Sequence, residues 1–228
     1  MALILVDARG ENLISVASGA NAAVTPDHVR RALADLKPTA GDIILVGHEI
    51  ATPAVLTALA AGRAAGATTI LNPAPAGGID RSTFGIADIL TPNRGELATI
   101  AAADARRVGR AAGAGGEPEA LARTLLETNS EGPGVRQAVV VTLGAAGAIV
   151  VRPTRDTVDV PAMTVRAIDT VGAGDAFNGA LAAGLAAGLD LEVAARRAVA
   201  AAAVSTTRAG AREGMPSIGE LEGFLAPG

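Results

Sequence analysis

The sequence predicts an α/β protein in which helices flank a mostly parallel β-sheet. Short runs rich in leucine and β-branched residues alternate with longer alanine-rich segments, which is the pattern of such folds. Half of the residues are hydrophobic, but the only aromatic side chains are three Phe, so we expect an aliphatic core. A chain of 228 residues suits one domain with a substantial core, or one domain with a small appendage.

Strands and helices are expected to alternate through the first hundred residues. The runs "ALILVDA" and "LISVAS" flank the polar turn "RGEN" and indicate an antiparallel hairpin. Two helices begin at Thr-Pro pairs, the first with Thr25 and the second with Thr52 as its cap. The remaining elements, in order, are a buried strand "DIILVG", a strand "TTIL", a strand "ADILT" and a helix opened by "PNRGE".

The second half begins with residues 104–116, "DARRVGRAAGAGG", where Gly and Arg predict a surface loop. A helix over 117–128 leads into "RQAVVVTLG", the strongest strand pattern of the chain. The runs "AAGAIVV", "DTVDVP" and "MTVRAI" indicate shorter strands, antiparallel at the sheet edge. Three helices are expected to complete the chain, one from about Gly174, one from Leu191 through Thr207, and one over 218–225.

Composition excludes several classes of function. A formal charge of −4 with a single lysine, Lys37, provides no basic stripe, and the shortage of aromatics leaves no base-stacking platform, so nucleic acid is not an expected partner. The lack of cysteine excludes disulfide scaffolds, thiolate zinc sites and cysteine nucleophiles. Two histidines, His28 and His48, are too few for a His-rich metal site.

The chain also lacks the features of a membrane or secreted protein. Its first residues, "MALILVDARGE", have neither a basic start nor a long apolar stretch. The longest apolar run, from Ala180 to Leu189, is too short to span a bilayer. We therefore expect a soluble, cytoplasmic protein without a membrane partner.

One stretch carries the most chemistry: residues 168–185, "IDTVGAGDAFNGALAAGL". The small residues Gly172, Ala173 and Gly174 leave backbone amides open to a ligand, and a helix start at this point favours an anion such as phosphate. Asp175 directly follows and could accept a proton from an attacking hydroxyl. A plain strand-to-helix turn, with Asp175 as an N-terminal charge, explains the same small residues equally well.

Other nucleotide and hydrolase motifs do not fit the sequence. A P-loop requires GxxxxGK[ST], but the single lysine precedes a proline. The segment "GAGDAFNG" is not a GxGxxG dinucleotide fingerprint, because position 177 is Phe. Neither a GxSxG elbow nor an HExxH helix is present.

The segment "DTVGAGDAFNGAL" closely resembles the C-terminal signature of the ribokinase family, the PfkB-type carbohydrate kinases. Further segments agree in the same order: "GEN…GANAAV", "LNPAPA", "ILTPNRGE", "VTLGAAGA" and "TRAGA". The resemblance implies a three-layer sandwich with a partial β lid over 1–18 and a kinase core over 19–228. It also implies a cytoplasmic sugar kinase, homodimeric in its full-length form, that uses ATP and Mg²⁺ to phosphorylate a pentose, in the first place D-ribose at its 5-hydroxyl.

The resemblance assigns roles around the proposed reaction. Asp175 would be the general base and touch the sugar hydroxyl, while the amides of Gly172, Ala173 and Gly174 would hold the transferring phosphoryl group. Glu49 falls on a sugar-contacting position. The family's NxxE element falls on Asn93, for phosphate, and Glu96, for Mg²⁺-bound water, although Asn93 is also a good helix cap.

The nucleotide and cation sites follow from the same resemblance. The nucleotide-binding set comprises Asn93, Thr142, Leu143, Gly144, Ala145, Ala146, Gly147, Gly174 and Val199, the last on the adenine side. A K⁺ site would use Asp169 together with the carbonyl groups of Val171, Ser205, Arg208 and Gly210. The family's sixth position in this site is often Ser and is Gly214 here.

The chain departs from the family at its start. Ribokinases begin with a strand that carries an Asn/Asp pair and with a "GGKGAN"-like segment, both of which grip the sugar; the "GAN" at 19–21 is a different segment. We therefore expect "DIILVG" and "TTIL" to lack partner strands. Three functions stay open: an active sugar kinase, a nucleotide-binding remnant without turnover, and a regulatory or oligomerisation partner.

Overall fold

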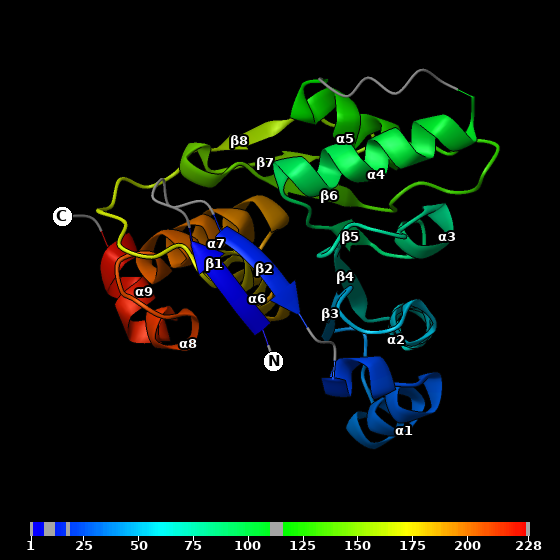
Figure 1. Cartoon of the computed structure of the whole chain (residues 1–228), viewed down its shortest axis with the longest axis horizontal. Helices are drawn as coiled ribbons and strands as arrows, with labels where there is room; N and C mark the ends of the chain where they lie inside the picture. The colour runs from blue at the N-terminus through cyan, green and yellow to red at the C-terminus, as the bar shows by residue number, and fades with distance from the viewer. Residues whose placement is uncertain (1, 7–11, 17–18, 110–115, 227–228) are drawn as a thin grey trace.

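The structure, a computed structural model, describes residues 2–6, 12–16, 19–109 and 116–226 and confirms the α/β prediction. Its main sheet has six strands that follow one another in chain order (Figure 1). The first four run parallel and the last two are antiparallel, as predicted for the edge. The strands are β3 (Ile43–Gly47), β4 (Thr68–Asn72), β5 (Ile89–Leu90), β6 (Ala138–Thr142), β7 (Ala148–Val151) and β8 (Val158–Val160).

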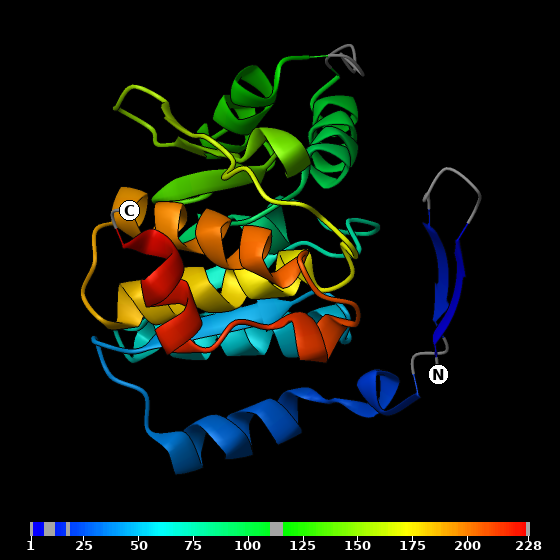
Figure 2. The same ribbon diagram turned by 90° about the vertical axis from the view of Figure 1, so that its left-hand side faces the viewer.

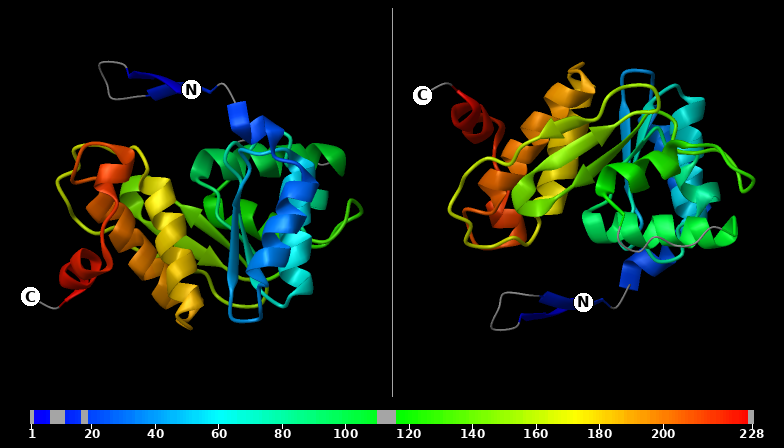
Figure 3. Two further views of the ribbon diagram at one scale, coloured as in Figure 1. Left: turned by 90° about the horizontal axis from the view of Figure 1, so that it is seen from below. Right: turned by 90° about the horizontal axis from the view of Figure 1, so that it is seen from above.

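Helices cover both faces of this sheet and make three layers (Figures 1 and 3). On one face lie α2 (Thr52–Ala64), α4 (Arg94–Arg107) and α5 (Pro118–Leu126); on the other lie α6 (Ala173–Ala186) and α7 (Leu191–Ser205). Alternate residues of β6 serve the two cores: Val139 and Val141 pack toward the first face, Ala138 and Val140 toward the second. Both cores are mainly aliphatic, as the composition predicts.

Four further helices lie outside these layers or connect them. The predicted first and last helices are present as α1 (Pro26–Leu36), which packs on α2, and α9 (Ile218–Leu225), which packs on α7. The single-turn helices α3 (Arg81–Phe84) and α8 (Ala211–Gly214) were not predicted. Over the part of the chain that the structure describes, no helix is both long and apolar enough to cross a membrane.

The two Thr-Pro helix starts differ. Thr25 caps α1 as predicted, because its Oγ1 accepts the His28 amide hydrogen at 3.3 Å. The prediction for the second start is wrong by one residue: Ala51 is the cap of α2 and Thr52 is its first residue. The Thr52 hydroxyl instead lies 3.2 Å from Nε2 of the buried His48, whose Nδ1 lies 2.9 Å from the Pro75 carbonyl oxygen. The Thr52 hydroxyl is therefore engaged by the His48 ring, four residues earlier, rather than by a cap of the helix start.

Two sequence predictions beyond residue 100 are wrong. The segment 104–116 is a loop only in part, because α4 continues to Arg107 and places Asp104 in the interior beside Arg81. Residues 110–115 of that predicted loop lie outside the described residues. The run "MTVRAI" is not a strand, and residues 161–167 are irregular instead. This irregular segment lines the cavity described below.

The expectation that two strands lack partners holds in part for "DIILVG", which pairs with β4 on one side and with no strand of the described residues on the other. β3 is the end strand, and the exposed fraction of Leu45 is 38%, so "DIILVG" is less buried than predicted. β4 pairs with both β3 and β5, so the expectation that "TTIL" lacks a partner is wrong. The predicted hairpin is present as β1 (Ala2–Val6) and β2 (Asn12–Val16), which form a separate two-stranded sheet (Figure 2). The predicted turn "RGEN" falls mostly outside the described residues.

Candidate active site

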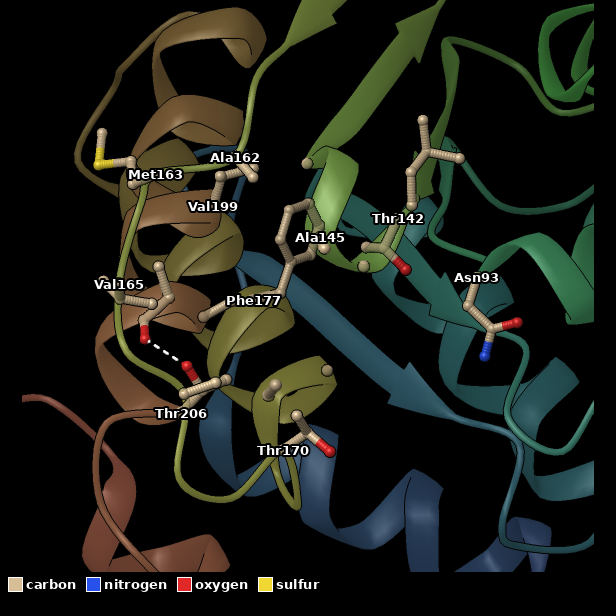
Figure 4. A pocket seen from close by; sticks show the side chains of 18 of the residues that line it. Asn93, Thr142, Ala145, Ala162, Met163, Val165, Thr170, Phe177, Val199 and Thr206 are labelled. Carbon is tan, nitrogen blue, oxygen red and sulfur yellow. Dashed lines mark hydrogen bonds between the residues drawn. The ribbon is translucent and has the colours of Figure 1, made fainter. Parts of the chain in front are cut away.

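A cavity of about 800 Å³ opens at the carboxyl ends of β5 and β6. Asn93 comes shortly after β5 and Thr142 ends β6, so both lie at this edge, where open α/β sheets bind their ligands. Figure 4 shows Asn93 and Thr142 on one side of the cavity and Met163, Val165 and Val199 on the other. The cavity therefore has a polar side and an apolar side.

The loop of small residues leads into the first turn of α6 at this cavity. Gly172 is the N-cap with φ 81° and ψ −2°, a left-handed conformation that favours glycine. Ala173 and Gly174 line the cavity. The Ala173 amide donates to the Thr170 carbonyl at 3.2 Å, whereas the amides of Gly172 and Gly174 donate to no backbone acceptor among the described residues. These free amides at the positive end of a helix favour an anion.

Asp175 follows at the mouth of the helix. Its side chain is exposed, and the described residues provide it with neither a hydrogen bond nor an ion pair. A carboxylate that only terminates a turn commonly bonds back to nearby backbone amides. The carboxylate is therefore available to a ligand, which is compatible with the chemical interpretation of the motif.

A residue that the sequence analysis overlooked fixes this turn to the sheet. Asn178 is buried on α6, and its Nδ2 donates to the Gly174 carbonyl at 2.9 Å. Its Oδ1 accepts the Thr91 hydroxyl, beside β5, at 2.6 Å. A buried Asn inside a helix is unusual, and that was the available signal for its role.

Asn93 and Glu96 form a capping box at the start of α4. Asn93 Oδ1 accepts the Glu96 amide at 2.9 Å, and Glu96 Oε2 accepts the Asn93 amide at 2.8 Å. Burial raises the pKa of the Glu96 carboxyl, while the hydrogen bond from the Asn93 amide acts in the opposite direction. The helix-cap interpretation of Asn93 is therefore confirmed, and its side-chain amide group remains turned toward the cavity edge (Figure 4).

The predicted nucleotide-binding turn joins β6 to β7 beside this helix start. The Thr142 amide donates to the Pro92 carbonyl at 3.0 Å, which holds the two segments together. Gly147 has φ 93°, and a Cβ at this position would lie 2.1 Å from the Val160 carbonyl oxygen, so only glycine fits. The predicted residues that line the cavity are Asn93, Thr142, Leu143, Gly144, Ala145, Gly147, Gly174 and Val199; Ala146 does not.

The apolar side of the cavity was largely missed. Phe177, from the first turns of α6, and the irregular residues 162–165 line the cavity together with Val199, and Ala162, Met163 and Val165 lie on the same side as Val199 in Figure 4. The sequence offered no signal for the latter, because the run "MTVRAI" has the composition of a strand. The Thr206 hydroxyl at this side donates to the Ala203 carbonyl at 2.7 Å (dashed in Figure 4). A flat, apolar group fits this side better than a charged one.

The predicted cation site gathers around the loop before α6. Asp169 accepts the Val171 amide at 3.0 Å and the Gly210 amide at 2.8 Å, and these hydrogen bonds, the one from Val171 foremost, lower the pKa of its carboxyl. A Cβ at Gly214 would lie 2.7 Å from the Ser205 carbonyl oxygen and 3.8 Å from that of Arg208. The Gly214 amide also donates to the Gly210 carbonyl at 2.9 Å, so three of the four predicted carbonyl groups, those of Ser205, Arg208 and Gly210, lie around Gly214. Oxygen donors of this kind suit a hard cation.

Glu49 and Glu96, the residues predicted to contact the sugar and Mg²⁺-bound water, are not among the residues that line the cavity. Glu49 follows β3, is exposed, and lies 3.5 Å from Asn21 Nδ2, but it does not line the cavity. Within the described ranges, no cluster of three or more His, Asp or Glu side chains could hold a metal ion alone. A divalent ion at Glu96 would therefore need further oxygen ligands from phosphate or water.

Free amides at a helix start, an exposed carboxylate and a nucleotide-sized cavity at the sheet edge are the groups that a phosphoryl-transfer site requires. Comparison with known proteins agrees. The model of the pfkB family carbohydrate kinases matches residues 1–218, and the chain belongs to this family of sugar kinases, which confirms the resemblance seen in the motifs.

Individual relatives extend the comparison. The deoxyribokinase of Salmonella typhi is 34% identical over 228 residues, which cover 99% of this chain and 69% of the relative. The ribokinase structure from Thermotoga maritima superposes with a TM-score of 0.81 at 33% identity, covering 98% of this chain and 68% of that one. An Arabidopsis thaliana ribokinase complexed with ribose and ATP superposes with a TM-score of 0.72 at 25% identity, covering 100% and 69%.

Proposed function

We propose that the chain transfers the γ-phosphoryl group of ATP to the 5-hydroxyl of D-ribose. One observation carries the proposal: Asp175, free of partners within the described structure, directly follows the free amides at the start of α6. This start borders a cavity large enough for a nucleotide. Ribokinases are among the similar proteins.

The chemical step uses residues of this one loop. Asp175 accepts the proton of the sugar hydroxyl while the oxygen of that hydroxyl forms a bond to the γ-phosphorus. The bond from the γ-phosphorus to the β,γ-bridging oxygen breaks, and ADP is released. The amides of Gly172 and Gly174, with that of Ala173, donate to the phosphoryl oxygens. Because charge develops on these oxygens, fixed donors at the helix start stabilise the transition state.

The nucleotide is proposed to lie across the cavity. Its phosphates would face Asn93 and the turn from Thr142 to Gly147, while its base would pack against Val199 and Phe177 on the apolar side. Polar donors on one side and an apolar wall on the other match the two ends of ATP.

Two metal ions fit the residues present. Glu96 has one oxygen bonded to the Asn93 amide, which leaves the other free to accept a hydrogen bond from Mg²⁺-bound water. Asp169 and the carbonyl groups of Val171, Ser205, Arg208 and Gly210 would hold K⁺ beside the loop. Bound cations supply positive charge that screens the phosphates from the incoming hydroxyl.

The sugar acceptor has a specific competitor. Because a deoxyribokinase is 34% identical to the chain, 2-deoxy-D-ribose is the second candidate acceptor. Glu49 is proposed to contact the sugar from the carboxyl end of β3. The remaining alternative is a protein that binds nucleotide without turnover.

A coupled assay of ADP release, run with D-ribose, with 2-deoxy-D-ribose and without sugar, tests the proposal. Saturable, ribose-dependent release of ADP supports the proposal. If kcat/KM were higher with 2-deoxy-D-ribose than with D-ribose, the deoxy sugar would be the acceptor instead. ATP binding by calorimetry without any sugar-dependent release would establish the binding-only alternative. The homodimer and the cytoplasmic location stay predictions. Sedimentation of the purified chain would test the first, and fractionation of the source cells would test the second.

A further inference from the structure

The cavity contains a charged side chain that the proposed mechanism does not use. Arg94 is the one residue with a formally charged side chain among those that line it within the described structure. The other polar lining side chains are neutral, namely those of Asn93, Thr142, Thr164, Thr170 and Thr206. A triphosphate placed there would therefore meet a single cationic side chain.

Arg94 is also free to take a new partner. Its side chain is exposed, and among the described residues it forms no ion pair and no side-chain hydrogen bond. By contrast, Arg107 at the other end of the same helix binds Asp80 at 2.9 Å. An arginine without an acid partner keeps all five of its donors for a ligand or for water.

Its position on the helix is unfavourable for a cation. Arg94 is the first residue of α4, where the helix dipole and the unsatisfied amides are positive. A positive side chain at this end is expected to destabilise the helix slightly, whereas a bound anion would offset that effect. A residue that breaks a local rule in this way is a candidate for a role in binding.

We propose that Arg94 binds the terminal phosphates of the nucleotide, and this inference rests on the proposed function of the cavity. Arg94 immediately follows Asn93, and the same cavity is lined by Gly174 at the start of α6. The planar guanidinium group can donate two parallel hydrogen bonds to one phosphate, which a neutral side chain cannot do. Arg94 would thereby approach the phosphates from the α4 side while the α6 amides approach them from the other.

The test measures binding of ATP, ADP and adenosine by calorimetry to the wild-type chain, Arg94→Gln and Arg94→Lys. Removing a charged hydrogen-bond partner is expected to weaken ATP binding by about 10- to 100-fold. ADP should lose less, adenosine should change by less than about twofold, and lysine should restore part of the affinity because it keeps the charge without the fork. The Gln effect on ATP should shrink as salt is raised.

Arg106→Gln is the matched control, because it removes the same charge from the exposed C-terminal turn of the same helix, away from the cavity. It should leave all three affinities unchanged. The ligand-free Arg94→Gln chain should melt no lower than wild type, since the substitution removes a positive charge from the positive end of the helix dipole. Equal losses for adenosine and ATP, or a lower melting temperature with unchanged ATP binding, would overturn the inference alone. A wild-type chain that binds none of the three ligands would overturn the proposed function as well.

Discussion

Replacing Arg81 by methionine is expected to destabilise the protein strongly, because this side chain holds three helices together. Arg81 is buried on α3 and donates two hydrogen bonds, both 2.8 Å long, to Asp104 on α4. It also donates to the Thr124 and Glu127 carbonyl oxygens at the end of α5, and its guanidinium lies 5.4 Å from the centre of the Phe84 ring. Methionine fills similar space but leaves these acceptors without their donor.

The magnitude follows from the burial of both partners. Their side chains are only 2% and 7% exposed, so the Asp104 carboxylate would stay in the interior without its counter-ion. The Asn129 amide, at 3.4 Å, is its other side-chain partner in the described structure and is too distant to compensate. Removing one partner of a buried pair costs about 3–5 kcal/mol. At about 2–4 °C per kcal/mol for a chain of this size, the melting temperature should fall by about 6–20 °C.

The assay is thermal and urea unfolding of the wild-type chain and three variants, followed by circular dichroism. Arg107→Met is the control, because Arg107 forms a more exposed pair with Asp80, at the surface, and should cost about 1 kcal/mol or less. The double variant Arg81→Met with Asp104→Leu should recover much of the loss, since no charge is left buried. If Arg81→Met destabilised the chain no more than Arg107→Met, the reasoning from burial would be refuted.

The remaining predictions concern the site. Asp175→Asn should lower phosphoryl transfer by about 10²–10⁴-fold and leave ATP affinity nearly unchanged, and a variant that kept most of its turnover would rule out Asp175 as the base. Gly147→Ala should unfold at lower urea than Gly144→Ala and lose ATP binding, because a Cβ at 147 meets the backbone at 2.1 Å whereas one at 144 meets nothing within 4 Å. The Asp169 pKa is lowered from its ordinary 3.8, so the wild-type chain should exceed Asp169→Asn in stability above pH 3.8 and lose that advantage as the pH falls through the folded-state pKa. A difference that stayed constant in urea titrations from pH 7 to 3 would contradict this last prediction.

Features set by neighbouring residues were predictable from the sequence. The cap of α1 by Thr25, the box of Asn93 with Glu96 and the glycine turn before α6 each depend on residues within four positions of one another. The capping rule failed at Thr52, because its hydroxyl lies against the buried His48, whose ring also contacts the Pro75 carbonyl oxygen 27 residues further along the chain. A local prediction failed again at Asp104, whose composition-based loop became helix once Arg81, 23 residues earlier, neutralised it in the interior.

The candidate site also contains both residues that the sequence identifies locally and residues that only the fold brings together. The amides and the carboxylate of the loop from Gly172 to Asp175 are encoded in consecutive residues and could be inferred as a unit. Phe177, Arg94 and the irregular segment 162–165 reach the cavity only because separate elements converge at the ends of β5 and β6. No local pattern distinguishes such residues from ordinary core or surface positions, so their roles depend on the fold.

Asn178 makes one hydrogen bond to a near neighbour in the sequence and one to a distant segment. Its bond to the Gly174 carbonyl lies within one turn of α6, but its bond to Thr91 spans 87 residues and joins α6 to the end of β5. Because the bond to Thr91 is buried, the first turn of α6 cannot rotate or slide relative to the sheet without leaving a buried polar group unpaired, at a cost of about 1–3 kcal/mol. Asp175 lies in that turn, so the sheet sets where its carboxylate stands relative to Asn93 and Thr142. The loop sequence supplies the reactive groups, and the long-range hydrogen bond positions them for a nucleotide held at the neighbouring strand ends.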